Sequence, residues 1–427
     1  MAPQGGRFIG PGKLSLWRTL GPGLITGAAD DDPSGIATYA QAGTQYGFGL
    51  AWTLLLAYPL MVAIQAICAR IGRTTGLGIA GNLREHYPPW TLSVIVGLLF
   101  AANVLNLGAD LGAMAESLRL LITVPTWLGV LLFGSITAGG QILLTHTRYV
   151  AFLKWLTLSL LAYFGTLATV RIPWGSLVRG LVWPGVRLDQ GFWLIVVAIF
   201  GTTISPYLFF WQAGQEVEDT KAEPSRQPLL EQPRQATRAL ARIRVDTLVG
   251  MGFSNLVGLA ILVTSAVTLK AGGVTTIETA AQAAAALRPV AGAAASTLFA
   301  IGIIGTGLLS VPVLAGSAGY ALGEARRWPV GFSRPPLRAK AFYASIALAT
   351  LLGAIANLLL IDPMKALVWA AVLNGIVSVP VMVMVMLIAD RRDIMGKFRI
   401  STRLRLTGWT ATAFMAVASA FFLYTSL

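Results

Sequence analysis

Apolar segments separated by short polar connections follow one another along almost the whole chain of 427 residues. An α-helix needs about 20 apolar residues to cross a bilayer, so the pattern predicts eleven membrane-spanning helices. We expect an all-α polytopic membrane protein in which residues 1–427 form one transmembrane domain, with helices at 17–43, 47–72, 91–115, 126–144, 150–170, 190–213, 246–269, 294–320, 340–360, 366–389 and 406–425.

Composition agrees with this prediction, since 55% of the residues are hydrophobic, 12% are charged and the mean hydropathy is +0.70. The basic residues lie mainly near the N-terminus and in the connections after even-numbered helices. The positive-inside rule then predicts a multi-pass protein of the cell membrane with a cytoplasmic N-terminus and an extracytoplasmic C-terminus. Basic residues dispersed among loops also explain the pI of 10.3, so that we expect the lipid bilayer and no nucleic acid as a partner.

The first apolar segment is interrupted by the run Gly27-Ala-Ala-Asp-Asp-Asp-Pro-Ser-Gly35. A carboxylate at membrane depth costs about 2.5 to 3.5 kcal/mol on insertion scales and is usually retained where it lines a pathway or pairs with another group. Pro33 and Gly35 also break the helix, and a broken helix survives in a membrane only where protein or a watery cavity surrounds its free carbonyls. The carboxylates from Asp30 to Asp32 therefore predict a cation site.

A second interruption, Gly201-Thr-Thr-Ile-Ser-Pro206, lies in the sixth segment. A single Ser-Pro step is often only a packing kink. Two interruptions five segments apart instead indicate inverted repeats whose discontinuous helices meet at the midplane, as in LeuT-type transporters. We expect two five-helix repeats, 17–170 and 190–389, with discontinuous first and sixth helices, an extra helix at 406–425 and a cytoplasmic linker at 218–244.

These segments resemble the natural resistance-associated macrophage protein (NRAMP) family of divalent metal transporters over most of the chain. The resemblance implies an eleven-helix LeuT-type fold and a divalent cation as the transported substrate. It rests on Gly21-Pro-Gly-Leu, Asp32-Pro-Ser-Gly-Ile-Ala-Thr and Gln41-Ala-Gly in the first segment, Ala69-Arg-Ile-Gly-Arg-Thr-Thr-Gly after the second, Gly108-Ala-Asp-Leu in the third and Gly201-Thr-Thr-Ile-Ser-Pro206 in the sixth.

Two departures from the family pattern concern the metal ligands. Members that carry manganese and iron typically have Asp-Pro-Gly-Asn in the first segment and Met-Pro-His in the sixth, and the Asp, Asn and Met side chains bind the metal. Here Gly35 takes the place of the Asn, and Ser205-Pro-Tyr207 replaces Met-Pro-His. Sulfur ligands favour transition metals, whereas oxygen ligands suit Mg²⁺ and Ca²⁺. We also expect Gly35 to enlarge the pocket, which suits Mg²⁺ because this ion usually keeps several waters.

The pattern thus resembles the divergent branch of NRAMP-related magnesium transporters, which implies Mg²⁺, and also Mn²⁺, as the substrate. On this interpretation Asp32 is the main charged ligand, assisted by freed backbone carbonyls and by hydroxyl or amide groups. An Asn in a membrane helix can equally hydrogen-bond a neighbouring helix. The predicted metal-site residues are Asp32, Ser205, Gly35, Ala29, Thr202, Asp31 and Asn374.

The family's usual route for protons is incomplete in this chain. Asp110 is retained, but Ala113 takes the place of a Glu one turn later, and Tyr207 and Gln212 take the places of two histidines. Since proton coupling needs titratable groups along a path, we predict alternating-access transport that is not obligatorily coupled to protons. The candidate pathway residues are Asp110, Tyr207, Gln212 and Glu116.

Other functions stay open at this stage. One is proton-coupled transport of Mn²⁺ or Fe²⁺, as in other members of the family. Another is a carrier of an organic cation or an amino acid, because LeuT-type folds host many substrates, and a third is a channel or sensor of the same fold. We expect no enzyme, because Cys68 and two scattered histidines form no nucleophile-and-base pair and no phosphate loop is present. We expect no cofactor besides the transported ion, and the oligomeric state is not indicated.

Overall fold

The computed structural model describes residues 22–143, 161–223, 225–358 and 362–426, and within these ranges the chain forms helices and no strand. The helices are α2 (Pro22–Asp30), α3 (Pro33–Tyr46), α4 (Ala51–Thr75), α5 (Ile79–His86), α6 (Pro89–Arg119), α7 (Thr126–Leu143), α9 (Leu161–Thr169), α10 (Trp174–Val182), α11 (Gln190–Thr203), α12 (Pro206–Ala222), α13 (Ala236–Ser265), α14 (Ala280–Ala284), α15 (Arg288–Ala291), α16 (Ala295–Ala325), α17 (Lys340–Asn357), α18 (Pro363–Asp390), α19 (Arg392–Met395) and α20 (Thr402–Ser426).

Nine helical runs in the described ranges are long and apolar enough to cross a bilayer. The first run, Pro33–Thr75, joins α3 and α4 through a short 3-10 turn, and therefore contains part of the predicted segment 17–43 and all of 47–72. The predicted helix at 150–170 lies partly outside the described residues, and its described part is α9. The multi-pass, all-helical architecture predicted from the sequence is confirmed within these ranges.

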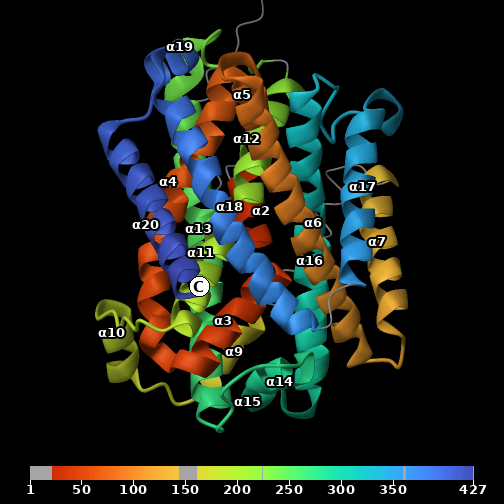
Figure 1. Ribbon diagram of the computed structural model, residues 1–427, viewed down its shortest axis with the longest axis vertical. Coiled ribbons are helices and arrows are strands. Elements are labelled where there is room, and N and C mark those ends of the chain that lie inside the picture. Colours follow the sequence, from red (N-terminus) through yellow and green to blue (C-terminus); the bar gives the residue numbers. More distant parts are fainter. Residues whose placement is uncertain (1–21, 144–160, 224, 359–361, 427) are drawn as a thin grey trace, which may run out of the picture.

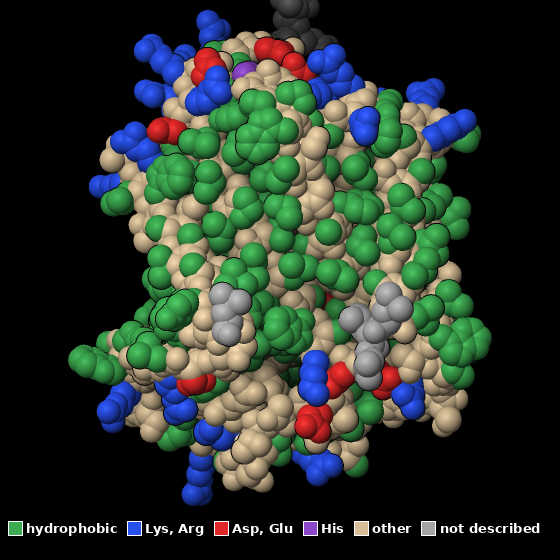
Figure 2. All heavy atoms as spheres, viewed as in Figure 1, with side chains coloured by type: hydrophobic (Ala, Val, Ile, Leu, Met, Phe, Trp, Pro, Cys, Tyr) green, Lys and Arg blue, Asp and Glu red, His purple; other side chains and the backbone are tan. Residues whose placement is uncertain are grey.

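The two ends of the molecule differ from its middle. Figure 1 shows α5 and α19 at one end and α10, α14 and α15 at the other, and we refer to these as the α5 end and the α14 end. The surface between them is covered mainly by apolar side chains, while Lys and Arg side chains gather toward the two ends (Figure 2). This distribution suits a protein surrounded by lipid at its waist and by water at both ends.

The helix pair α11 and α12 forms the centre of the structure. In the most apolar part of this run 89% of the residues are buried, compared with 33% in α7 and 39% in α20. α11 packs against α18 and α20, and α12 packs against α4 and α16. α7 and α20 therefore lie at the periphery, where their apolar side chains face lipid.

Helix ends follow from capping residues. The Asp362 side chain accepts hydrogen bonds from the backbone N–H groups of Met364 and Lys365, at 3.1 and 3.2 Å, and Pro363 begins α18. This combination of an acidic N-cap and a first-turn proline is a common helix start. α4 ends at Gly76, whose φ of 72° is readily adopted only by glycine.

The predicted linker at 218–244 is shorter than expected, which corrects the sequence-based boundary. α12 continues to Ala222 and α13 already begins at Ala236. Many polar residues of this stretch are exposed, but Arg242 of α13 forms an ion pair with Glu216, a buried residue of α12 just before the stretch. The short helices α5 and α10 were also not predicted, because eight or nine residues are too few to appear as a membrane span.

α2 and α3 lie along α13 because small residues line the contact. A Cβ atom on Gly27 of α2 would collide with the Gly250 backbone of α13. A Cβ atom on Gly258 of α13 would lie only 2.9 Å from the Tyr39 ring of α3. Ser254 lies between Gly250 and Gly258 in α13, and its hydroxyl faces the break between α2 and α3. Close backbone approach through small residues is a general way of packing membrane helices.

We predict that Gly27→Ala lowers the apparent melting temperature of the purified protein in detergent, because the added methyl group meets backbone atoms that cannot rotate away. The expected cost is about 1 to 3 kcal/mol. Gly97→Ala is the matched control, since Gly97 lies exposed in helix α6 with no atom within 4 Å of an added Cβ. An equal or higher melting temperature for Gly27→Ala than for Gly97→Ala would contradict this packing.

Candidate metal site

Two helices are broken at the same depth of the structure. Between α2 and α3, Asp32 has extended backbone angles (φ −66°, ψ 169°) and Pro33 begins the second half. Between α11 and α12, Ser205 is likewise extended (φ −80°, ψ 136°) and Pro206 begins the second half. The Tyr207 hydroxyl of α12 donates a hydrogen bond to the Ala29 carbonyl of α2, which joins the two broken helices. The predicted discontinuous first and sixth helices are confirmed.

The Asp32 carboxylate is held by four donors. Oδ1 accepts hydrogen bonds from the Ser34 hydroxyl and the Gly35 backbone N–H, both at 2.7 Å. Oδ2 accepts from the Asn106 side-chain amide at 3.1 Å and from the Tyr207 hydroxyl at 3.4 Å. Asp32 is only 1% exposed. It therefore serves both as the N-cap of α3 and as an acceptor from two other helices, α6 and α12.

Tyr207 connects two of the predicted metal ligands. Its hydroxyl lies 3.0 Å from the carbonyl oxygen of Ala29 and 3.4 Å from Oδ2 of Asp32. One phenolic proton cannot donate a full hydrogen bond to both acceptors, so the two oxygens together lack one donor. A cation bound by both oxygens would take the place that this O–H proton now fills.

Asn106 is the centre of a polar cluster that sequence reasoning missed. Its side-chain amide donates to Asp32 and, at 3.4 Å, to Asp110, while its oxygen accepts from Asn374 at 3.1 Å. Asp110 also accepts from the Ser310 hydroxyl at 3.2 Å. Asn374 is thus linked to Asp32 by hydrogen bonds through Asn106, and its own side-chain oxygen is buried without a hydrogen-bond partner. A polar residue one turn before Asp110 in an apolar segment was the available signal for Asn106.

The side chains of Ser205 and Thr202 face the second break. The Ser205 hydroxyl donates to the carbonyls of Gly201 and Thr202, at 2.5 and 2.9 Å, so it satisfies backbone freed by the break. The Thr202 hydroxyl is buried without a hydrogen-bond partner. A Cβ on Gly35 would lie only 2.9 Å from this hydroxyl. The expectation that Gly35 enlarges the pocket is therefore wrong at this point, because Thr202 fills the space beside it.

Asp30 and Asp31 contact a different helix from Asp32. The Ser254 hydroxyl of α13 lies 2.5 Å from Oδ2 of Asp30 and 3.3 Å from Oδ1 of Asp31. The other oxygen of each carboxylate is buried without a hydrogen-bond partner. The structure thus separates the three carboxylates into Asp32 with α6 and α12, and the pair Asp30 and Asp31 with α13. The role of Asp31 as a metal ligand stays a prediction.

The four carboxylates of this region have no basic partner in the described part of the chain. Asp30, Asp31, Asp32 and Asp110 are at most 1% exposed, and each ion pair found there involves other residues. Buried charge without a partner is costly, so protons or a cation must balance it. In the described ranges no three His, Cys, Asp or Glu residues gather closely enough to hold a metal by themselves. A metal here would depend on one or two carboxylates together with neutral oxygens.

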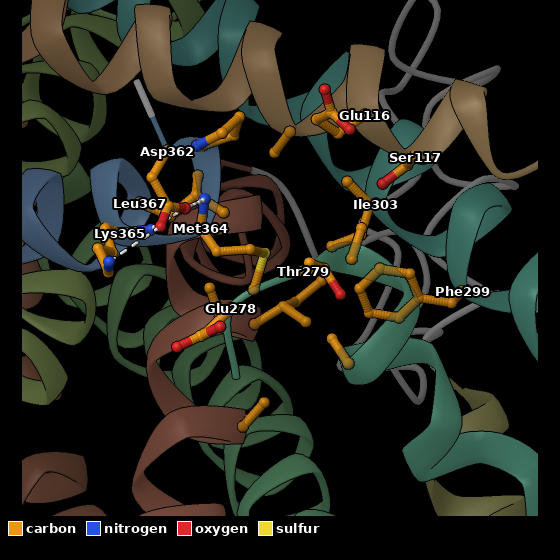
Figure 3. A pocket seen from close by; sticks show the side chains of 17 residues that line it. Glu116, Ser117, Glu278, Thr279, Phe299, Ile303, Asp362, Met364, Lys365 and Leu367 are labelled. Carbon is orange, nitrogen blue, oxygen red and sulfur yellow. Dashed lines mark hydrogen bonds and ion pairs between the residues drawn. The ribbon is translucent and has the colours of Figure 1, made fainter. Parts of the chain in front are cut away.

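A cavity of about 410 Å³ lies between this region and the α14 end. Ile36 and Ala37 of α3 and Ala113 of α6 are part of its lining, whereas Asp32 is not. Figure 3 shows three acidic side chains around it: Glu116, Glu278 and Asp362. Glu116 pairs with Arg119 at 2.9 Å. We refer to this cavity as the vestibule. Glu116 is part of its lining, whereas Asp32 is not.

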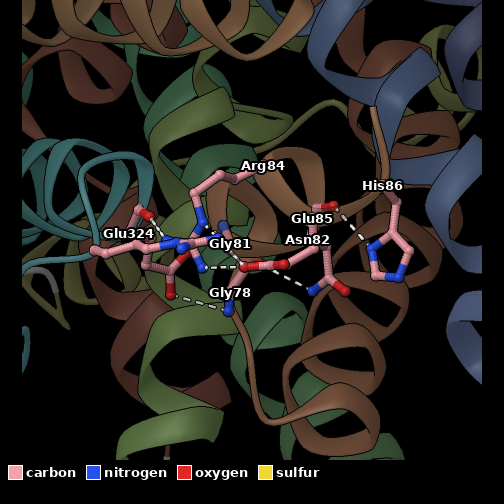
Figure 4. Close-up of polar contacts among 8 residues, drawn as sticks. Gly78, Gly81, Asn82, Arg84, Glu85, His86 and Glu324 are labelled. Carbon is pink, nitrogen blue, oxygen red and sulfur yellow. Dashed lines mark hydrogen bonds and ion pairs between the residues drawn. The ribbon is translucent and has the colours of Figure 1, made fainter. Parts of the chain in front are cut away.

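On the opposite side, the α5 end is fixed by a capping carboxylate. Glu324 of α16 accepts hydrogen bonds from the backbone N–H groups of Gly78 and Gly81 at 2.9 Å each (Figure 4), which places a carboxylate at the N-terminus of α5. Deeper on this side, Gln212 accepts from the Thr26 hydroxyl. Asp32 itself is buried between the two ends.

We predict that Gly35→Ala destabilises the protein and that Thr202→Ala relieves part of the loss. Thr202→Ala alone should cost only about 1 kcal/mol, because the hydroxyl it removes is buried without a hydrogen-bond partner and the methyl group lost with it is small. A double-mutant cycle of unfolding free energies, derived from the thermal unfolding curves, should give a coupling energy of about 1 kcal/mol. Strictly additive effects would mean that the Thr202 hydroxyl does not restrict the space beside Gly35.

Comparisons with known proteins agree with this geometry. The chain is 27% identical to the divalent metal cation transporter MntH of Burkholderia ambifaria over 428 residues, covering 97% of this chain and 90% of the relative. It is 26% identical to MntH of Deinococcus radiodurans, covering 95% and 89% of the two chains.

Solved structures show the same fold. The Eremococcus coleocola manganese transporter superposes with a TM-score of 0.76 at 17% identity, over 97% of this chain and 88% of the other. MhsT, solved with L-phenylalanine, has a TM-score of 0.60 at 13% identity, over 95% and 98% of the two chains. The sequence profile of the group described as "Natural resistance-associated macrophage protein-like" matches residues 23–425. With nearly the whole chain matched, the protein belongs to the NRAMP family.

Proposed function

We propose that this protein carries divalent metal cations across the membrane by alternating access, with Mg²⁺ and also Mn²⁺ as substrates. Relatives that are 26 to 29% identical are divalent metal cation transporters by name, which supports metal transport rather than an enzymatic activity. In the orientation that we propose, the N-terminus and the α5 end face the cytoplasm. The cavity at the α14 end then opens toward the outside.

The observation that carries the proposal is the buried Asp32 carboxylate beside an oxygen-rich break. Its oxygens accept hydrogen bonds from Ser34, Gly35, Asn106 and Tyr207, and the Tyr207 hydroxyl also meets the Ala29 carbonyl. The sulfur ligand typical of the family is replaced by Ser205. Sites built from carboxylate, carbonyl and hydroxyl oxygens suit Mg²⁺ and Mn²⁺ better than softer metals.

We further propose that transport is not obligatorily coupled to protons. Asp110 is linked to Asp32 through the Asn106 amide, which does not titrate in the physiological range. The next position on the usual route, Ala113, lines the vestibule with a methyl group. His86, the one histidine in the described ranges, is the last residue of α5 and hydrogen-bonds the Asn82 carbonyl, away from the site. These features support a carrier without a continuous proton path.

The experiment is uptake of Mg²⁺ and Mn²⁺ into liposomes that contain the purified protein, with a pH-sensitive dye in the lumen. We expect saturable uptake of both ions at constant lumen pH. Asp32→Asn should reduce uptake at least tenfold, because even indirect damage to a metal site commonly costs about 10- to 100-fold. Asp393→Asn is the matched control, since it removes an exposed carboxylate at the α5 end.

Three outcomes would overturn parts of this proposal. Mn²⁺ uptake with lumen acidification and without Mg²⁺ flux would indicate a proton-coupled transition-metal carrier. Equal uptake by Asp32→Asn and Asp393→Asn would remove Asp32 from the site. Uptake that does not saturate would indicate a channel.

A further inference from the structure

A groove on the outside of the helix bundle lies apart from the metal site. It has a volume of about 630 Å³, and residues of α4, α13 and α20 line it near the α5 end. α4 packs against both α13 and α20 (Figure 1), so it forms the floor between them. The groove therefore faces the region that lipid occupies around the helices.

The floor of the groove is a stripe along α4. Tyr58, Val62, Ala66 and Arg70 follow one another at four-residue intervals, which places them on one face of the helix. All four are partly exposed. The Tyr58 hydroxyl donates to the Leu248 carbonyl of α13 at 3.2 Å and closes the inner end of the groove. The stripe is thus apolar along its length and ends in a guanidinium group at the mouth.

Three arginines, one from each helix, gather at the groove. Arg70 is fixed by hydrogen bonds from its guanidinium to the carbonyls of Phe398 and Arg399, at 2.7 and 3.0 Å. Arg244 and Arg403 are exposed and take part in none of the ion pairs found in the described ranges. Neither Asp nor Glu is among the described residues that line the groove. The mouth therefore carries a concentrated positive charge above an apolar channel.

We propose that this groove binds an anionic phospholipid, with its phosphate on Arg70, Arg244 and Arg403 and an acyl chain along Val62 and Ala66. Basic residues at the end of a membrane helix are common by themselves. A hollow that combines three arginines with apolar walls matches both parts of a lipid, and basic pockets between membrane helices recognise anionic head groups. A free phosphate would use only the arginines.

Native mass spectrometry of the delipidated full-length protein tests this proposal, with phosphatidylglycerol as the anionic lipid and phosphatidylcholine as the zwitterionic one. We expect preferential binding of phosphatidylglycerol. Arg244→Gln with Arg403→Gln should weaken it roughly thirtyfold, since each basic residue near a membrane surface contributes about 1 kcal/mol. Arg326→Gln with Arg338→Gln is the matched control, because both arginines are exposed and absent from the groove lining.

A second variant tests the apolar part of the site without changing charge. Ala66→Phe should fill the groove and weaken phosphatidylglycerol binding while leaving the melting temperature of the lipid-free protein unchanged. Equal binding of the two lipids, equal loss in both double variants, or undiminished binding by Ala66→Phe would overturn the proposal. Competition by glycerol phosphate at the same concentration as the lipid would also overturn it, because the head group alone would then suffice.

Discussion

Buried negative charge without a basic partner is the constraint on which the rest of the structure depends. Four carboxylates lie at the centre of a membrane protein and are balanced in the described ranges only by hydroxyl, amide and backbone donors. Such an arrangement is costly in an empty site and becomes favourable when a cation enters. The two broken helices meet the same need, because each supplies carbonyl oxygens that an unbroken helix would keep for itself.

Hydroxyl groups occupy the centre of this buried region. Tyr207 bridges the Ala29 carbonyl and Asp32, and Ser205 satisfies two carbonyls of α11. Because these groups are buried, the hydroxyls hold oxygens that a cation bound at Asp32 would contact. In the proposed alternating-access mechanism, the vestibule and the capped N-terminus of α5 are the two places where the structure would open.

Most of the fold could be predicted from the sequence, because long apolar segments and their two interruptions report directly on bilayer crossing and helix breaks. The extent of the linker at 218–244 could not, since Glu216 and Arg242 look solvent-exposed until the helices pair them. In the site, Asp32 and Tyr207 were identified, whereas Ser254 was missed because a serine in an apolar helix gives no distinctive signal. The tight space beside Gly35 depends on a Thr202 rotamer, which no sequence pattern specifies.

The central claim is that a divalent cation binds at Asp32, between the two broken helices. The most direct test is anomalous diffraction from crystals of the protein soaked in Mn²⁺. We predict a peak within coordination distance of the Asp32 carboxylate and the Ala29 carbonyl, with the Tyr207 hydroxyl turned away from one of them. A peak only beside Asp30, Asp31 and Ser254, or only in the vestibule near Glu278, would contradict the claim.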